Sequence, residues 1–212
     1  MHTERIQLLG AGGHTAVVVD ALLASGQPAD QIDVWTQGQI EAGQNVLGIA
    51  VRHLLVLAAL AGLPFHICIG DNRTRGRLYA ELSALDARPF SIVHPAATVS
   101  PYATIGSGTL VAARAIIAPR AAVGKGGIIN HGAVVDHDCH VGDFAHIAPG
   151  ATLGGAVQVG DLALIGAGAN ILPSRRVGRG GTIGAGSVVV QDTQENVVYA
   201  GVPAAPFGQR II

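Results

Sequence analysis

An aliphatic residue recurs every six positions from residue 93 to residue 189 of this 212-residue chain. A mostly small residue follows four positions after each. An α-helix repeats every 3.6 residues and a strand every two, so neither explains a period of six. Hexapeptide periodicity is typical of a parallel β-helix, in which each short strand points one aliphatic side chain inward before a turn. The seventeen repeat positions are Val93, Val99, Ile105, Val111, Ile117, Val123, Ile129, Val135, Val141, Ile147, Leu153, Val159, Ile165, Ile171, Val177, Ile183 and Val189.

The composition excludes several other classes of protein. Hydrophobic residues make up 49% of the chain, which argues against disorder. A net charge of -1 without Lys/Arg runs argues against nucleic acid as a partner. Cys68 and Cys139 form no disulfide framework, which favours a cytoplasmic location. We expect no signal peptide, because the N-terminal MHTERIQLLGAGG has no apolar h-region. We also expect no membrane span, because Arg52 and His53 interrupt the longest apolar run, residues 46–63, which fits a buried strand and helix better.

The residues before the repeat show a different pattern. Apolar, β-prone segments predict strands at residues 6–9, 32–35 and 65–69, and helices are expected after the first and third. Gly10, Gly12 and Gly13 permit a tight turn before the first helix, whose N-terminus would suit an anion. Alternating strands and helices predict a small parallel, Rossmann-like α/β domain. We therefore divide the chain into residues 1–90, residues 91–190 and a C-terminal tail at 191–212.

Four motifs in order identify a family that the chain resembles. They are GAGGH at 10–14, IGDNRTR at 69–75, IVHPAATVSPYATIG at 92–106 and GVPA at 201–204. With the uninterrupted hexads, they resemble the sugar O/N-acetyltransferases of the NeuD/PglD type, which belong to the left-handed β-helix hexapeptide-repeat superfamily. The resemblance implies three hexads per coil, a left-handed β-helix that binds acetyl-CoA, a front domain that binds a nucleotide sugar, and a homotrimer.

The family motifs also imply substrate contacts in the front domain. In the family, acidic residues often end the second strand, but this chain has Thr36 and Gln37 there. Because of that departure, the sequence does not decide which nucleotide base the front domain binds. The substrate-binding residues that the resemblance implies are Gly12, Gly13 and His14 at the uridine phosphate, Gly70 close by, and Asn130 near the active site.

The catalytic candidates lie in the stretch VVDHDCHVGDFAHIAPGATLGG. An 18-residue coil stacks His137 and Gly155 at one corner, about 5 Å apart. The histidine could take a proton from an attacking group and the glycine N–H could hold the oxyanion. The family motif is a His followed by an acid, with a second His nine residues on. It matches His137 as the general base, Asp138 as its partner and His146 at the thioester, and Asp136 remains an alternative partner for His137.

The resemblance places acetyl-CoA along the coils. It implies backbone contacts from Ala167 and Ala185 to the pantetheine, and these two residues stack with Pro149 at 18-residue spacing. The tail would complete this site, although Ala205 replaces the Lys that usually follows GVPA.

The remaining histidines and cysteines suggest no second chemistry. His131 and His140 are expected on exposed turns or faces, and Cys139 is expected in the core. The γ-class carbonic anhydrases share this fold and bind zinc through three imidazoles, including a pair five residues apart. The spacings here contain no such pair, so we expect no metal.

These observations predict an N-acetyltransferase that moves the acetyl group of acetyl-CoA to the 4-amine of a UDP-linked 4-amino-4,6-dideoxy sugar, for glycan biosynthesis. A sialic acid or other sugar O-acetyltransferase is the main alternative, and a different acyl-CoA donor is another. An inactive nucleotide-binding scaffold and a metal hydratase are alternatives of a different class.

Overall fold

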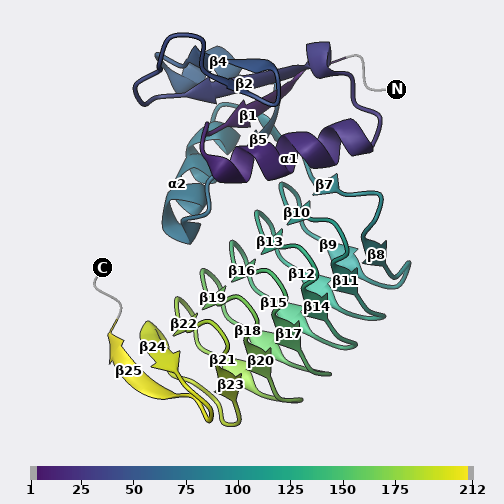
Figure 1. Ribbon diagram of the computed structural model, residues 1–212, viewed down its shortest axis with the longest axis vertical. Coiled ribbons are helices and arrows are strands. Elements are labelled where there is room, and N and C mark those ends of the chain that lie inside the picture. Colours follow the sequence, from purple (N-terminus) through teal and green to yellow (C-terminus); the bar gives the residue numbers. More distant parts are fainter. Residues whose placement is uncertain (1–3, 210–212) are drawn as a thin grey trace.

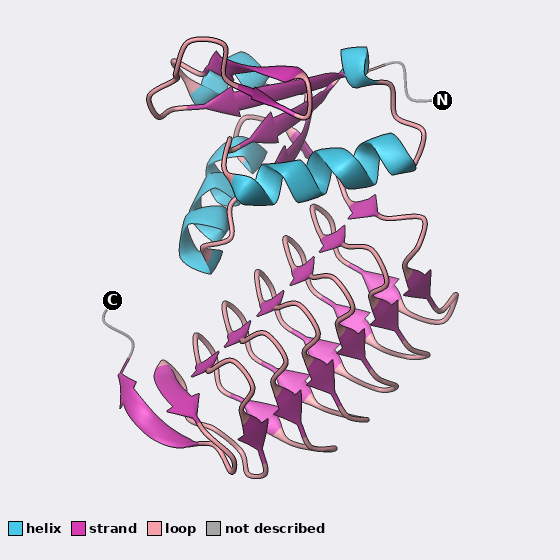
Figure 2. Ribbon diagram, viewed as in Figure 1, coloured by secondary structure: helices cyan, strands magenta, loops and turns pink. Residues whose placement is uncertain are grey.

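The computed structural model describes residues 4–209, which form two stacked parts (Figure 1). A small α/β domain carries the N-terminus, and a long prism of short strands extends from it to the C-terminal end (Figure 2). The predicted fold class, a small parallel sheet followed by a left-handed parallel β-helix, is confirmed. Within the described residues, neither α-helix has the length and apolar character needed to cross a bilayer.

The front domain is a sheet with the strand order β3-β4-β2-β1-β5-β6. All its pairings are parallel except the β3–β4 hairpin. Helix α1 (Gly13–Ala24) follows the first strand and α2 (Asn72–Ser83) follows the fifth, with short 3-10 helices η1 (Ala29–Gln31) and η2 (Leu57–Leu60) elsewhere. The strands are β1 (Ile6–Leu9), β2 (Ile32–Thr36), β3 (Asn45–Val46), β4 (Ile49–His53), β5 (Pro64–Ile67) and β6 (Arg88–Pro89).

These bounds agree with most of the predicted elements. The strand at residues 6–9 and both helices are found, β2 is one residue longer than predicted, and β5 is shifted toward its N-terminus. The segment 46–63 contains β4 as its buried strand, but its helix is only the single 3-10 turn η2. Gly62, at φ +71, and Pro64 follow that turn directly. Neither conformation continues a helix, which explains the short η2.

Seventeen two-residue strands build the β-helix in three sheets, named C, D and E here. Sheet C contains β7 (Ile92–Val93), β10 (Leu110–Val111), β13 (Ile128–Ile129), β16 (His146–Ile147), β19 (Leu164–Ile165) and β22 (Thr182–Ile183). Sheet D contains β8 (Thr98–Val99), β11 (Ile116–Ile117), β14 (Val134–Val135), β17 (Thr152–Leu153), β20 (Asn170–Ile171) and β23 (Val188–Val189). Sheet E contains β9 (Thr104–Ile105), β12 (Ala122–Val123), β15 (His140–Val141), β18 (Gln158–Val159) and β21 (Arg176–Val177).

Each strand pairs with the strand 18 residues further on, as Val111 does with Ile129 and Ile117 with Val135. Three hexads therefore make one coil, as the resemblance implied. The repeating aliphatic side chains point inward, and those between residues 111 and 189 are at most 4% exposed. Cys139 is fully buried among them, so its predicted place in the core is confirmed. Burying each aliphatic side chain contributes about 1.5–3 kcal/mol.

The C-terminal tail extends sheet C. Strand β24 (Val197–Ala200) pairs parallel with β22, and β25 (Ala205–Gln209) returns antiparallel along it. Residues 210–212 of the predicted tail lie outside the described part of the chain.

The front domain rests on the outer face of sheet C. Ile92, Leu110 and Ile128 point outward there, yet each is at most 2% exposed. They share one apolar cluster with Val18 and Leu22 of α1, which covers them. The outward positions of the first strands of sheet C are therefore aliphatic because they form the interface between the two parts.

A buried arginine joins the two parts by hydrogen bonds. Arg75 of α2 is 2% exposed. Its guanidinium donates to the carbonyls of Gly126 and Phe144 in the β-helix, both at 2.7 Å, and to those of Ile69 and Gly70 in the front domain, at 2.9 and 3.1 Å. Burial lowers the pKa of Arg75 to about 10. Carbonyl dipoles offset most of the charge of the buried guanidinium. Because these hydrogen bonds join α2 to carbonyls of the β-helix, they fix where α2 sits on it.

Replacing Arg75 by Met should lower the free energy of unfolding by about 3 kcal/mol or more, because several buried carbonyls lose their donor. Urea unfolding followed by circular dichroism would measure this. Arg77→Met is the matched control, since Arg77 lies on the same helix in an exposed pair with Glu81. That pair should contribute no more than about 0.5 kcal/mol. Equal losses in the two variants would contradict the role assigned to Arg75.

Candidate active site

The predicted histidine-acid pair lies at the corner between sheets D and E. His137 Nδ1 is 2.7 Å from Asp138 Oδ2, and the backbone N–H of His137 donates to Asp136 Oδ1 at 2.7 Å. The side-chain partner of His137 is therefore Asp138, and Asp136 orients the backbone instead. This resolves the choice that the sequence left open.

The charge of Asp138 fixes the tautomer of its partner. Two hydrogen bonds, first from Arg120 and then from His137, hold the pKa of the Asp138 carboxyl well below its usual range. An ionised carboxylate can only accept, so His137 Nδ1 must carry the hydrogen. The lone pair of Nε2 is then free to take a proton from a reacting group.

Gly155 lies directly against the ring of His137, one coil further on. The N–H of Ala156 donates to the His137 carbonyl at 2.8 Å, which fixes this stacking. A Cβ on Gly155 would lie 2.6 Å from both Cε1 and Nε2 of His137. Within residues 4–209 the Gly155 N–H has no acceptor. A proton acceptor and an unused N–H donor are therefore side by side, as the predicted chemistry requires.

Asn130 and His146 form a second group, on sheet C and the corner that follows it. Asn130 Oδ1 accepts the His131 N–H at 2.9 Å, so its Nδ2 donates to His146 Nε2 at 3.2 Å. His14, at the start of α1, faces His146 with the ring centroids 6.5 Å apart. The structure thus brings together three residues predicted separately for the substrate and the cofactor.

Both rings in this group are uncharged near neutral pH. Burial first, and then the charge of Arg75, lowers the pKa of His14 to about 4 and that of His146 to about 4. Neutral imidazoles can donate through one nitrogen and accept through the other. His14 Nε2 is buried and has no hydrogen-bond partner among the described residues.

Ala167 and Ala185 lie on the corner between sheets C and D. The N–H of Gly168 donates to the Pro149 carbonyl and that of Gly186 to the Ala167 carbonyl, at 2.9 and 2.8 Å. The predicted stack of positions 149, 167 and 185 is thereby found. Both alanines are exposed, and their small side chains leave the corner open.

One chain therefore carries the predicted site in two halves. His137, Asp138 and Gly155 occupy the D–E corner, whereas His146, Asn130 and the alanine stack belong to sheet C and the C–D corner. The spacing of nine residues between His137 and His146 is half a coil, so the two histidines cannot share a corner. The nine-residue spacing in the sequence therefore already indicated that the two histidines lie at different corners of the coil.

The front domain has a hollow of about 230 Å³ at the carboxyl ends of β1, β2 and β5. Ligands of open α/β sheets bind at this edge. Thr36 and Gln37 line it with Gly10, and so do Thr74 and Arg77 of α2, which sequence reasoning missed.

The predicted glycines flank this hollow rather than line it. Gly12 is the N-cap of α1 and Gly13 its first residue, and a Cβ on either would meet no atom within 4 Å. Open space therefore lies in front of the helix N-terminus. Gly70 is exposed at the end of β5, and its carbonyl accepts from Arg75.

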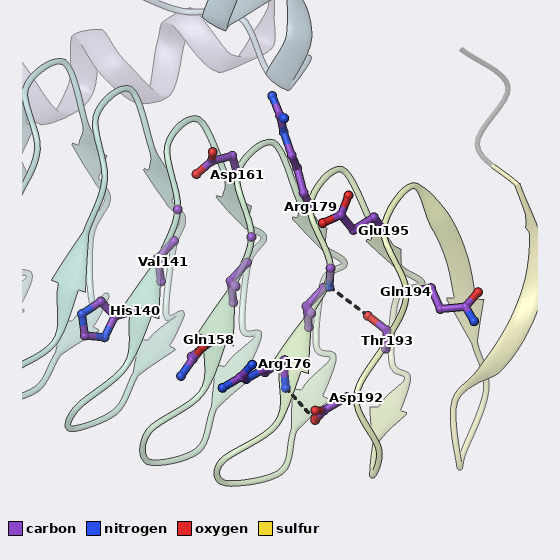
Figure 3. A pocket seen from close by; sticks show the side chains of 15 residues that line it. His140, Val141, Gln158, Asp161, Arg176, Arg179, Asp192, Thr193, Gln194 and Glu195 are labelled. Atoms are coloured by element: carbon purple, nitrogen blue, oxygen red, sulfur yellow. Dashed lines mark hydrogen bonds between the residues drawn. The ribbon is translucent and has the colours of Figure 1, made fainter.

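A larger hollow of about 730 Å³ lies on sheet E near its C-terminal end (Figure 3). Residues 192–195 form one of its walls. In this segment Asp192 Oδ1 accepts the backbone N–H of Arg176 at 3.0 Å. His140 lines it and is exposed, as His131 is at its own turn, in agreement with the sequence. None of the predicted catalytic or cofactor residues lines this hollow, so we do not place the reaction there.

Metal ligands were not expected from the sequence. Among residues 4–209, no three His, Cys, Asp or Glu side chains are grouped so that they could hold a metal ion.

Gly155→Ala should reduce kcat by about 100-fold, because the added methyl must displace the His137 ring and a misplacement of about 1 Å has an effect of that size. The melting temperature should change little, because the flexible ring can move. Steady-state kinetics and thermal melting would test this. Full activity in Gly155→Ala would contradict the assigned geometry.

Comparisons with known proteins agree with the two-part fold. Residues 5–82 match the family model of the PglD N-terminal domain. Perosamine N-acetyltransferase from Caulobacter crescentus, solved with CoA and GDP-perosamine and with one histidine replaced by asparagine, is 34% identical. The match covers 98% of both chains with a TM-score of 0.91.

The acetyltransferase domain of PglB from Neisseria gonorrhoeae, in complex with acetyl coenzyme A, is 36% identical over 96% of this chain and 99% of that chain, with a TM-score of 0.88. WeeI from Acinetobacter baumannii is 25% identical over 97% and 100%, also with a TM-score of 0.88. Since these similarities span nearly every residue, the chain belongs to the left-handed β-helix, hexapeptide-repeat family of sugar N-acetyltransferases with a PglD-type N-terminal domain.

Proposed function

We propose that the protein transfers the acetyl group of acetyl-CoA to the amine of a nucleotide-linked 4-amino-4,6-dideoxy sugar. The observation that carries this proposal is the His137–Asp138 pair, 2.7 Å apart, whose free Nε2 lies beside the unused Gly155 N–H. A proton acceptor next to an oxyanion donor is what direct acyl transfer needs. The CoA and acetyl-CoA complexes of the family support acetyl-CoA as the donor.

The reaction proceeds in one direct transfer. The sugar amine attacks the thioester carbonyl while His137 Nε2 takes its proton, and the Gly155 N–H donates to the oxyanion. The C–S bond then breaks, CoA leaves as a thiolate, and the proton on His137 returns to it. No covalent bond to the enzyme forms, and Cys139 is excluded as a nucleophile by its complete burial.

The acceptor is a nucleoside diphosphate sugar held by the front domain. The GDP-perosamine in the relative's structure supports an amino sugar on a nucleotide. Sequence resemblance favours UDP, whereas this relative favours GDP. The hollow at Thr36 and Gln37 presents a hydroxyl and an amide without a carboxylate, so we include both nucleotides as candidates. His14, Gly12 and Gly13 would approach the diphosphate at the N-terminus of α1.

We further propose a homotrimer with one reaction site between each pair of neighbouring chains. Apolar side chains are open to solvent on sheet D and at its edge in the single chain. Ile116 of β11 is 41% exposed, and Leu172 and Val190, each directly after a strand of sheet D, are 43 and 38% exposed. Packing three D sheets around one axis would cover them. It would also bring the C–D corner of one chain, with Ala167, against the D–E corner of the next, with His137. Both halves of the site would then meet around acetyl-CoA.

The cytoplasm, where acetyl-CoA and nucleotide sugars occur, is the proposed location. The product would enter the synthesis of surface glycans.

Thiol release from acetyl-CoA by the purified protein tests the proposal. We expect release with GDP-perosamine or a UDP-linked 4-amino-4,6-dideoxy sugar, an acetamide on the product by mass spectrometry, and a loss of about 100-fold or more in His137→Ala. His140→Ala, a histidine outside the site, should remain active. Release only with sialic acid would indicate an O-acetyltransferase, and no release with any acceptor would remove the proposed substrate class.

A further inference from the structure

Arg120 lies one coil before Asp138 and occupies the same position in its turn. The two residues are 18 positions apart and have almost the same left-handed backbone, with φ +62 and +61. This backbone directs both side chains outward from the D–E corner, one above the other. Their alignment is therefore set by the coil repeat and does not depend on a flexible loop.

The Arg120 guanidinium holds the Asp138 carboxylate by two parallel hydrogen bonds. Arg120 Nε donates to Oδ1 at 2.6 Å and Nη2 donates to Oδ2 at 2.8 Å. Oδ2 is also the atom that accepts from His137 Nδ1 at 2.7 Å. A bidentate pair fixes the plane of the carboxylate as well as its position. The carboxylate plane in turn fixes the direction of the hydrogen bond to His137.

We propose that Arg120 is a positioning residue for acetyl transfer: it clamps Asp138, which then holds the His137 ring with Nε2 directed at the reaction site. This inference rests on the proposed function, because it assigns a role through the proposed base. The four groups form one chain of contacts, from Arg120 through Asp138 and His137 to Gly155. Arg120 itself touches no reacting atom.

Arg120 has no second acidic partner within the described residues. The same column continues with Tyr102 one coil before Arg120 and Ala156 one coil after Asp138, and neither is an acidic residue. The side chain is 68% exposed in the single chain, and an unpaired surface arginine at such a corner would have no reason to hold a fixed orientation. The carboxylate of the catalytic pair supplies that reason.

The clamp is what holds the carboxylate plane in place. The charged groups that face His137 are Asp138, Arg120 behind it, and Asp136 at its backbone N–H. Without Arg120, Asp138 could still accept from His137 Nδ1, but nothing would fix the plane of its carboxylate. The His137 ring would then lose its fixed direction toward the reaction site.

Kinetics of Arg120→Met, Arg120→Lys and the control Arg114→Met test the inference. Arg114 is exposed, has φ +61 and sits at the preceding corner of the same coil, without an acidic partner among the described residues. Arg120→Met should lower kcat between about 10- and 100-fold, as expected for a displaced base. It should leave KM for acetyl-CoA unchanged, because Arg120 touches neither substrate.

Lysine retains the charge but loses the fork. Arg120→Lys should therefore recover only part of the kcat that Arg120→Met loses. In an Asp138→Asn background, Arg120→Met should have no further effect on kcat, because the two residues act in series. Arg114→Met should match the parent protein in both kcat and KM.

Two results would overturn the inference. One is an unchanged kcat in Arg120→Met. The other is a raised KM for acetyl-CoA alone, which would make Arg120 a cofactor contact. In either case, loss of activity in His137→Ala would leave the proposed function intact. Full activity in His137→Ala would instead remove the proposed base, and this inference with it.

Discussion

Parallel pairing between strands 18 residues apart is the constraint on which this molecule depends. Each strand is two residues long and gains its hydrogen bonds only from the coils above and below. The repeat therefore fixes which residues meet at every corner, and the aliphatic core locks that register. Gly155 beneath His137 and Arg120 above Asp138 are both consequences of this one rule. The candidate site is thus built on rigid strand ends, where a catalytic pair can be held without a mobile loop.

The front domain is placed against this prism by two kinds of contact with different roles. Apolar packing of α1 on Ile92, Leu110 and Ile128 supplies the burial, but apolar packing is not directional. The hydrogen bonds of Arg75 are directional, and they connect the end of β5 to two successive coils. The same guanidinium helps to keep His14 and His146 uncharged. One buried cation therefore affects both the position of the proposed nucleotide domain and the chemistry of the histidines between the two parts.

Much of the fold and of the candidate site could be predicted from the sequence, because the six-residue spacing directly reflects the geometry of the β-helix. It predicts a parallel β-helix and the core position of Cys139. The three-hexad coil that the family resemblance implied adds the stacking of His137 on Gly155. It does not give side-chain direction at a turn, so the choice of Asp138 over Asp136 and the clamp by Arg120 required coordinates. Arg75 was missed for another reason. Nothing in the sequence IGDNRTR distinguishes it from a solvent-exposed helix residue, and its burial depends on contacts with the β-helix. The β3–β4 hairpin and the single turn at η2 depend on local glycine and proline conformations that periodicity does not report.

In the proposed trimer, transfer occurs where the D–E corner of one chain meets the C–D corner of another. Mixed oligomers test it most directly. His137→Ala removes one half of the site, and Ala167→Trp fills the exposed cofactor corner of the other, so each variant alone should be inactive. Coexpressed in equal amounts, they should regain about one quarter of wild-type activity, because random assembly leaves both halves intact at about one interface in four. Native mass spectrometry would verify mixing. Mixed trimers without any recovered activity would contradict a site shared between chains.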